Sequence, residues 1–214
     1  MRSLLLFLLL LGLAGLELAG PAWAQESLHG HMRYPEAAPE DLVAVCTGNS
    51  PRLHKDAAQA LRVMIEAARA DGTDLRALSC FRSIQKQRYL FCRHVCDPRG
   101  QVCGKSCDGR RESEKARAQV SAPPGHSEHA TGYAVDFADG RNRKCDFEIC
   151  FGGTEASLWL AENAATFGFE LSFPEDNAQG ISFEPWHWRF VGTPEARQLF
   201  QAARQRYPAS PAVR

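Results

Sequence analysis

The chain has 214 residues, in which 25 Lys and Arg side chains balance 25 Asp and Glu side chains, so the formal net charge is zero. This balance excludes the basic excess that usually marks a nucleic-acid-binding protein, and it gives no support to binding of another polyanion. The length suffices for one domain with a sizeable core.

The first 24 residues have the layout of a secretory signal peptide. Arg2 supplies a basic start, residues 4–16 form an apolar run, and Ala22-Trp23-Ala24 is a cleavage site of the small-x-small kind. A membrane anchor is the alternative, but the apolar run is shorter than the roughly 20 residues of a spanning helix. We therefore expect residues 25–214 to form an exported domain, periplasmic or extracellular, without stable membrane insertion. Nothing in the sequence fixes the oligomeric state.

Residues 25–52 contain three prolines and predict a loop-rich segment. Apolar residues recur at helical spacing over residues 54–70, and Asp71-Gly72 ends this predicted helix. A short strand over residues 75–81 and a polar helix over residues 83–94 follow.

The second half of the chain predicts strands over residues 133–138, 169–173 and 186–191, with a final helix over residues 194–207. Between them, residues 154–167 predict a helix that ends at Gly168, where a C-cap glycine is expected. Its candidate core residues are Leu158, Trp159, Ala161, Ala165 and Phe167. The pattern is that of a single mixed α+β domain.

The chain has eight cysteines, an even number, and together with an export signal they predict disulfides: Cys46, Cys80, Cys92, Cys96, Cys103, Cys107, Cys145 and Cys150. The segment from about 92 to 125 is poor in large apolar residues, and we interpret it as a disulfide-stapled insertion. The expected pairs are Cys92–Cys107, Cys96–Cys103, Cys145–Cys150 and Cys46–Cys80. A second zinc site on the four clustered cysteines is the less favoured alternative.

Two segments carry residues with metal chemistry, Gly125 to Asp136 and Glu184 to Trp188. They offer His129, Asp136 and His187 as ligands, and catalytic zinc is held by three protein ligands with a fourth position left open. Glu184 lies three residues before His187, a separation that lets one side chain bind metal while the other faces its open side. Neither segment contains the helical His-Glu-x-x-His motif of a common zinc peptidase class.

The motifs Ser127-x-His129-x2-Gly132-x-Ala134-x-Asp136 and Glu184-x-Trp186-His187-Trp188 resemble those of the VanY-type D-alanyl-D-alanine metallocarboxypeptidases, relatives of the hedgehog signalling domain. A third motif, Ser79-Cys-Phe-Arg82-Ser with Gln87 five residues after the arginine, is also similar. The three lie in the family's order across residues 55–192. Phe81 replaces the family's usual tyrosine, Tyr133 replaces a frequent aliphatic residue, and the cysteine-rich insertion is foreign to the family core.

The resemblance implies a small, mostly antiparallel sheet flanked by helices, and one Zn²⁺ per chain. His129, Asp136 and His187 match the zinc ligands, Glu184 the general base, and Arg82 the arginine that stabilises the oxyanion. Ser127 and Gln87 match positions near the substrate, and Trp186 is expected in the pocket wall.

The function that follows is an exported zinc D,D-carboxypeptidase acting on peptidoglycan stem peptides. A zinc endopeptidase on the same fold is one alternative, and a non-catalytic zinc-binding recognition module is another. Glu184 and Arg82 argue against the module, because a pure binder needs neither residue.

Overall fold

The computed structural model describes residues 26–48, 50–97, 100, 102–104 and 112–207. The predicted signal peptide and Cys107 lie outside this part of the chain. Within it, no helix is long and apolar enough to cross a membrane.

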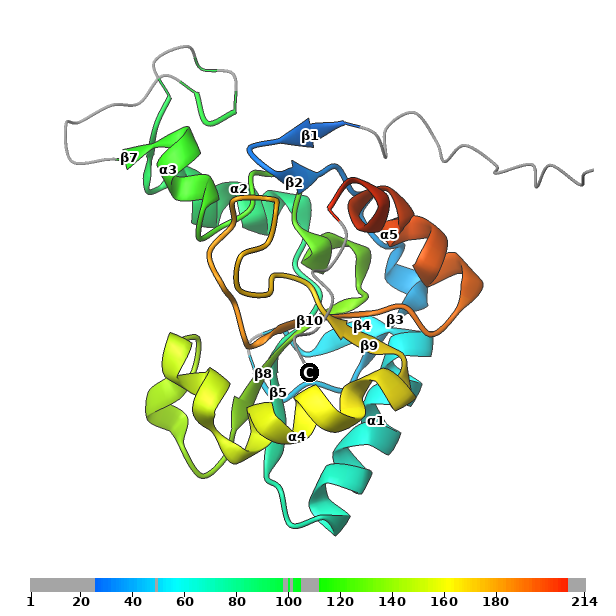
Figure 1. The fold of residues 1–214 in the computed structure, drawn as a ribbon. Coiled ribbons are helices and arrows are strands. Elements are labelled where there is room, and N and C mark those ends of the chain that lie inside the picture. The colour runs from blue at the N-terminus through cyan, green and yellow to red at the C-terminus, as the bar shows by residue number, and fades with distance from the viewer. Residues whose placement is uncertain (1–25, 49, 98–99, 101, 105–111, 208–214) are drawn as a thin grey trace, which may run out of the picture.

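A four-stranded antiparallel sheet with the strand order β5-β8-β10-β9 forms the centre of the molecule (Figure 1). The strands span β5 (Leu75–Ser79), β8 (Ala134–Asp139), β9 (Phe169–Leu171) and β10 (His187–Phe190). All four lie where strands are predicted from the sequence. The α+β prediction is thereby confirmed.

Strand β8 is buried on both faces. Its side chains point alternately to the hydrophobic core on one face and to the candidate site on the other. Val135 and Phe137 belong to the main hydrophobic core. That core is completed by α1 (Lys55–Ala70) and α4 (Glu155–Asn163), which lie on the same side of the sheet (Figure 1). Asp136, between the two apolar residues, points to the opposite face, where the site is built.

The predicted apolar face is correct for α1 but only partly correct for the α4 segment. In α1 the residues Ala57, Leu61, Met64 and Ala68 are buried as expected. In the segment 155–167, Trp159 is buried and Phe167 packs against the core as predicted. Leu158, by contrast, is 58% exposed and Ala161 and Ala165 are exposed, whereas the other buried apolar residues are Ala156, Leu160 and Ala164. This segment is apolar around most of its circumference, so periodicity alone does not select the buried face.

The segment before α1, predicted to be mostly loop, contains two short antiparallel strand pairs. One joins β1 (Ser27–Leu28) to β2 (His31–Met32), and the other joins β3 (Leu42–Ala44) to β4 (Arg52–His54). At the other end of the described chain, α5 (Pro194–Arg206) buries Ala196, Phe200 and Ala203 in the main core.

The cysteine-rich segment forms a small unit beside the sheet, at the upper left of Figure 1. Its elements are α2 (Ile84–Cys92), β6 (Val95–Cys96), β7 (Glu112–Ser113) and α3 (Glu114–Ala118), with β6 and β7 paired in parallel. Phe91, Val95 and Ala118 form a separate hydrophobic cluster at its centre.

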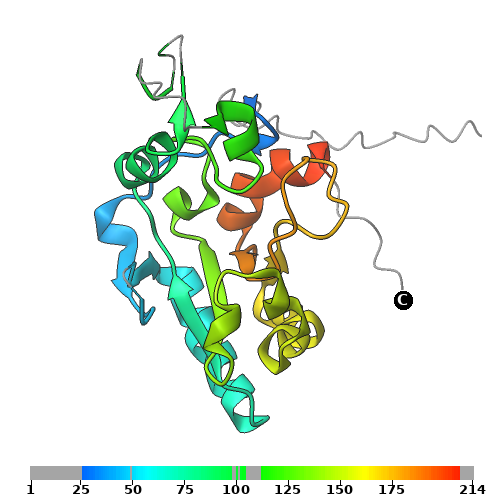
Figure 2. The same ribbon diagram turned by 90° about the vertical axis from the view of Figure 1, so that its left-hand side faces the viewer.

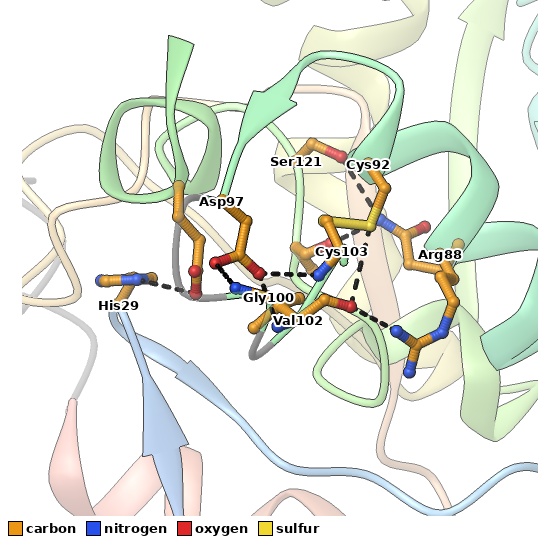
Figure 3. Close-up of a disulfide and its surroundings, with 11 residues drawn as sticks. His29, Arg88, Cys92, Asp97, Gly100, Val102, Cys103 and Ser121 are labelled. Atoms are coloured by element: carbon orange, nitrogen blue, oxygen red, sulfur yellow. Dashed lines mark hydrogen bonds and ion pairs between the residues drawn. A yellow bond between two sulfur atoms is a disulfide. The ribbon is translucent and has the colours of Figure 1, made fainter. Parts of the chain in front are cut away.

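The disulfides agree with the expected pairing at Cys46–Cys80 and Cys145–Cys150, but Cys92 pairs with Cys103. The nested pairing predicted for the insertion is therefore wrong. The reason is a tight turn after β6, in which the Asp97 carboxylate accepts hydrogen bonds from the backbone N–H groups of Gly100, Val102 and Cys103 (Figure 3). This turn returns Cys103 to the end of α2. Cys96 is also disulfide-bonded, so no described cysteine is free to hold a metal.

Candidate active site

Strand register brings together two of the three predicted metal ligands. Asp136 on β8 lies directly across from His187 on β10, and directly opposite residues of an antiparallel pair point to the same face. The distance from Asp136 Oδ1 to His187 Nδ1 is 2.9 Å. Two residues separated by 51 positions in the sequence are thus adjacent because of sheet pairing alone.

The third predicted ligand, His129, comes from a 3₁₀ turn, η3 (Glu128–Thr131), that precedes β8. Gly132 ends this turn with φ of +71°, and a Cβ there would lie 2.8 Å from the Leu42 side chain. Glycine therefore permits both the backbone conformation and the close packing. His129 Nε2 lies 3.1 Å from Asp136 Oδ2. The ligand atoms of His129, Asp136 and His187 all lie within 4.8 Å of one another, and all three residues are buried.

The outward-facing nitrogens of both imidazoles are held by the protein. His129 Nδ1 lies 2.7 Å from the Cys80 carbonyl oxygen, and His187 Nε2 lies 3.0 Å from Glu128 Oε2. These acceptors favour a proton on the outer nitrogen, which leaves His129 Nε2 and His187 Nδ1 directed at Asp136. Two imidazole nitrogens and one carboxylate, oriented in this way, are a donor set that suits Zn²⁺.

The charge of the cluster also favours a cation. Burial lowers the pKa of His187, but hydrogen bonds and charges from Asp136 and Glu128 outweigh burial and raise it to about 10. Burial raises the pKa of Asp136, yet His129 and His187 hold it well below its usual range. The protonated His187 ring therefore donates one N–H to Asp136 and the other to Glu128, a position where a positive charge is strongly stabilised.

Glu128 is a residue of the site that the sequence reasoning missed. Its carboxylate is buried and accepts hydrogen bonds from Ser172 Oγ at 2.6 Å, from Arg189 Nη1 at 2.7 Å and from the Tyr34 hydroxyl at 3.3 Å, in addition to its contact with His187. Burial raises its pKa, but Arg189 and His187 hold it well below the usual range. Two features of the sequence could have indicated this role. Glu128 lies inside the motif between Ser127 and His129, and Arg189 follows His187 by two positions, on the same face of the strand.

Glu184 lies just before β10 and lines the cleft over the three ligand residues. Its Oε2 atom is 4.0 Å from His187 Nδ1, and its side chain is 15% exposed. Burial is the main cause that raises the pKa of Glu184 to about 7. A carboxyl group with a pKa near neutrality is suited to proton transfer at neutral pH.

Arg82 enters the site after β5 and is held by two contacts with the chain. Its backbone N–H donates to the His129 carbonyl at 3.1 Å, and its Nη1 donates to Gln87 Oε1 at 2.8 Å. The remaining Nη2 lies 3.9 Å from Asp136 Oδ2. Burial lowers the pKa of Arg82, but a guanidinium keeps its charge in proteins.

The predicted substrate residues differ in position. Ser127 and Trp186 line a cleft of about 720 Å³ that also contains Arg82, Glu184 and the three ligand residues. Gln87 is only 1% exposed and lies behind Arg82, where its Nε2 donates to the Ala122 carbonyl at 2.5 Å. The structure therefore places Gln87 as a support for Arg82 and not as a lining residue of the cleft.

The family model for VanY, D-alanyl-D-alanine carboxypeptidase, matches residues 50–193 of the chain. The chain belongs to the VanY family. The matched range contains all of the site residues predicted from the sequence.

Individual VanY-family proteins and solved structures agree with this placement. The chain is 32% identical over 169 residues to a D-alanyl-D-alanine carboxypeptidase of Enterococcus faecalis, covering 78% of this chain and 58% of that protein. It spans about half of the length of the curated relatives it matches, 49% and 58% for two of them.

Among solved structures, the LdcB LD-carboxypeptidase is similar with a TM-score of 0.60 and 29% identity, over 75% of this chain and 73% of that one. A VanY D,D-pentapeptidase variant in complex with Zn(II) is similar with a TM-score of 0.55 and 27% identity, over 84% of this chain and 94% of that one.

Proposed function

We propose that this VanY-family chain is an exported zinc D,D-carboxypeptidase that removes the terminal D-alanine from peptidoglycan stem peptides. The observation that carries the proposal is the convergence of His129, Asp136 and His187 beneath a cleft, with Glu184 beside them. The family and its zinc-bound relative supply the substrate class and the metal.

His129 Nε2, His187 Nδ1 and an Asp136 carboxylate oxygen would hold one Zn²⁺ per chain. Zinc supplies a water of lowered pKa and a Lewis acid for the substrate carbonyl. The chain keeps the donor atoms oriented through Cys80 and Glu128, which bind the outer nitrogens of the two imidazoles.

Glu184 is the proposed general base. Its carboxylate accepts a proton as water attacks the scissile carbonyl, and the resulting acid donates that proton to the departing D-alanine amine. Burial raises the pKa of the Glu184 carboxyl towards neutrality, which suits a group that first accepts and then donates a proton.

Arg82 is the proposed partner of the negative oxygen that develops in the tetrahedral intermediate. Its guanidinium is fixed by Gln87 and lines the cleft together with Glu184. A donor that is oriented before the reaction stabilises the developing charge without further reorganisation. Ser127 and Trp186 also line the cleft and are proposed to contact the peptide.

Export is supported by the sequence of residues 1–24 and by the disulfides. Cys46–Cys80, Cys92–Cys103 and Cys145–Cys150 are of a kind that persists in oxidising compartments. A periplasmic or extracellular location would give the enzyme access to peptidoglycan.

An L,D-carboxypeptidase is the second candidate, favoured by the similarity to the LdcB structure. The two activities differ in the bond that is cut. A D,D-enzyme removes the last D-alanine from a peptide ending in D-Ala-D-Ala. An L,D-enzyme removes the remaining D-alanine from the shortened peptide, in which an L-residue precedes it.

Incubation of the zinc-loaded protein with peptides of both kinds, followed by mass spectrometry, tests the proposal. We expect release of D-alanine from the D-Ala-D-Ala peptide, and its loss after chelation of the metal. Cleavage restricted to the second peptide would replace the proposal with the L,D-activity. Absence of cleavage of any stem peptide by the zinc-loaded protein would contradict both.

A further inference from the structure

The cleft has two chemically different walls. One wall is formed by the cysteine-rich unit, which includes α2 and α3, and it carries Lys86, Arg93 and Arg117. The other wall, after β8, carries Phe147, Glu148 and Ile149. Figures 1 and 2 show α2 and α3 toward one end of the molecule and the segment after β8 toward the other. None of the three cations is a defining residue of the family motifs, although Lys86 lies between Arg82 and Gln87 of the third motif.

The cations of this wall are poorly neutralised by the protein itself. Among the residues that the structure describes, no carboxylate pairs with Lys86 or Arg93. Lys86 Nζ and Arg93 Cζ instead lie 5.4 and 6.0 Å from the ring centroid of the exposed Tyr89. Arg117 has a loose ion pair with Glu112 at 3.5 Å, and its buried Nε atom makes no hydrogen bond within the described chain. The Arg117 side chain is 22% exposed and the Lys86 and Arg93 side chains are exposed, so their solvent-facing nitrogens keep donor capacity for an anion.

The charges of Arg93 and Arg117 also affect the pKa of a neighbouring histidine. The pKa of His94, which lies between α2 and β6, is lowered first by partial desolvation and then by the charges of Arg117 and Arg93. A cluster of like charges beside a cleft is unfavourable without a counter-charge, and it becomes favourable when an anion binds.

The wall is held in place by cross-links on its far side. The Cys92–Cys103 disulfide joins the end of α2 to the Asp97 turn, and the Arg88 side chain donates to the Val102 carbonyl (Figure 3). Phe91, Val95 and Ala118 pack between α2 and α3. Binding to a wall that is already ordered avoids the entropy cost of fixing long cationic side chains on a mobile segment.

We propose that Lys86, Arg93 and Arg117 form a subsite for a carboxylate of the peptide substrate that lies apart from the scissile bond. The inference rests on the proposed function, since it assumes that the cleft holds a peptide. Guanidinium groups bind carboxylates in a planar, two-point arrangement, which suits them to this role. Across the cleft, Phe147 and Ile149 are apolar and Glu148 is acidic, which leaves one wall only for the anion.

Binding of matched peptides to a protein that does not turn them over tests the subsite. The zinc-loaded Glu184→Gln protein is titrated by calorimetry with acetyl-Glu-D-Ala-D-Ala, acetyl-Gln-D-Ala-D-Ala and succinyl-Gln-D-Ala-D-Ala, so that the extra carboxylate is on the side chain, absent, or at the N-terminal cap. We expect at least one carboxylated peptide to bind about fivefold to tenfold more tightly than the neutral one, with the preference reduced at high salt.

The variants locate the preference. The ratio of the affinities for the carboxylated and the neutral peptide should fall to near unity when Arg93→Gln and Arg117→Gln are combined. Arg93→Gln alone, which alters an exposed residue, should reduce this ratio. Lys115→Gln is the matched control, because Lys115 is an exposed cation of α3 that does not line the cleft. It should leave the preference unchanged.

Three results would overturn the subsite. The first is equal binding of all three peptides. The second is a preference that persists in the Arg93→Gln, Arg117→Gln protein. The third is an equal weakening of every peptide in that protein, which would assign the wall to the terminal carboxylate. Binding of none of the peptides would contradict the proposed function as well, whereas hydrolysis by the wild type without a preference contradicts the subsite alone.

Discussion

Glu128 Oε2 lies 3.0 Å from His187 Nε2, while Asp136 Oδ1 lies 2.9 Å from Nδ1 of the same ring. The imidazole of His187 is thus held between two carboxylates that have different tasks. Asp136 belongs to the metal-ligand set, and Glu128 fixes the ring orientation from behind. Glu128 is itself held by Arg189 and Ser172, so the support extends two residues away from the metal position.

Substitution Glu128→Gln should lower zinc affinity by about tenfold to a hundredfold, because the carboxylate that orients His187 is lost. Competition with a fluorescent zinc chelator measures this directly. Glu170→Gln is the control, since Glu170 also contacts Arg189, at 2.7 Å, but not His187. Equal zinc affinities for the two variants would show that Glu128 does not act through His187.

The Arg82–Gln87 hydrogen bond predicts a coupled effect on turnover. Arg82→Ala should lower kcat by about a hundredfold, the effect of losing an oxyanion donor, and Gln87→Leu by about tenfold with little change in KM. In the Arg82→Ala background, Gln87→Leu should have almost no further effect, because its partner is already absent. Steady-state kinetics of the four proteins measure the coupling. Gln85→Leu, on the exposed side of α2, is the control; additive losses would contradict the supporting role.

The two disulfides that the sequence predicted correctly should differ in their contribution to stability. Cys46–Cys80 joins residues 34 positions apart, whereas Cys145–Cys150 joins residues 5 apart. By the loop-entropy model, replacing each pair with alanine should lower the free energy of unfolding by about 4 and about 2 kcal/mol, respectively. Denaturant unfolding measures both.

Loss of Cys46–Cys80 should also weaken zinc binding, because the Cys80 carbonyl accepts a hydrogen bond from His129 Nδ1. Zinc competition on the same two alanine variants tests this. Loss of zinc affinity in the Cys145–Cys150 variant to the same extent would speak against a specific link between Cys80 and His129.

His31 should make the protein less stable in acid. Burial is the main cause that lowers its pKa to about 4, from 6.5 for an unperturbed imidazole, so protonation favours the unfolded chain. The stabilisation is complete above pH 6.5 and is lost as the pH falls towards 4, which amounts to about 2 kcal/mol between pH 7 and pH 5.

The His31→Gln protein, which keeps a donor for the Ala118 carbonyl, should lack this part of the pH dependence. The measurement is the difference in unfolding free energy between the two proteins at each pH, at equal zinc content. A constant difference from pH 7 to pH 5 would contradict the assignment.

The strands of the central sheet and the longer helices were predicted because each has a local signal, whereas the short strands β1 to β4, β6 and β7 and the short helix α3 were not. The motifs also predicted the convergence of Asp136 and His187. The sequence could not predict which acidic neighbour supports His187, because the contact between Glu128 and β10 depends on how the η3 turn packs against the sheet. The complete buried face of α4 and the disulfide partner of Cys92 were not predicted correctly for a similar reason. Both are decided by tertiary packing and by a side-chain turn at Asp97, neither of which leaves a periodic pattern in the chain.

Titration of zinc into metal-depleted wild-type and Glu184→Gln proteins, with bound zinc and released D-alanine followed in the same samples, tests the central claim most directly. Both proteins should bind one zinc per chain. D-Alanine release from a D-Ala-D-Ala peptide should rise with bound zinc in the wild type and be lower by about 10³-fold in Glu184→Gln. Hydrolysis at the wild-type rate by zinc-loaded Glu184→Gln, or full activity of the wild type without metal, would contradict the account.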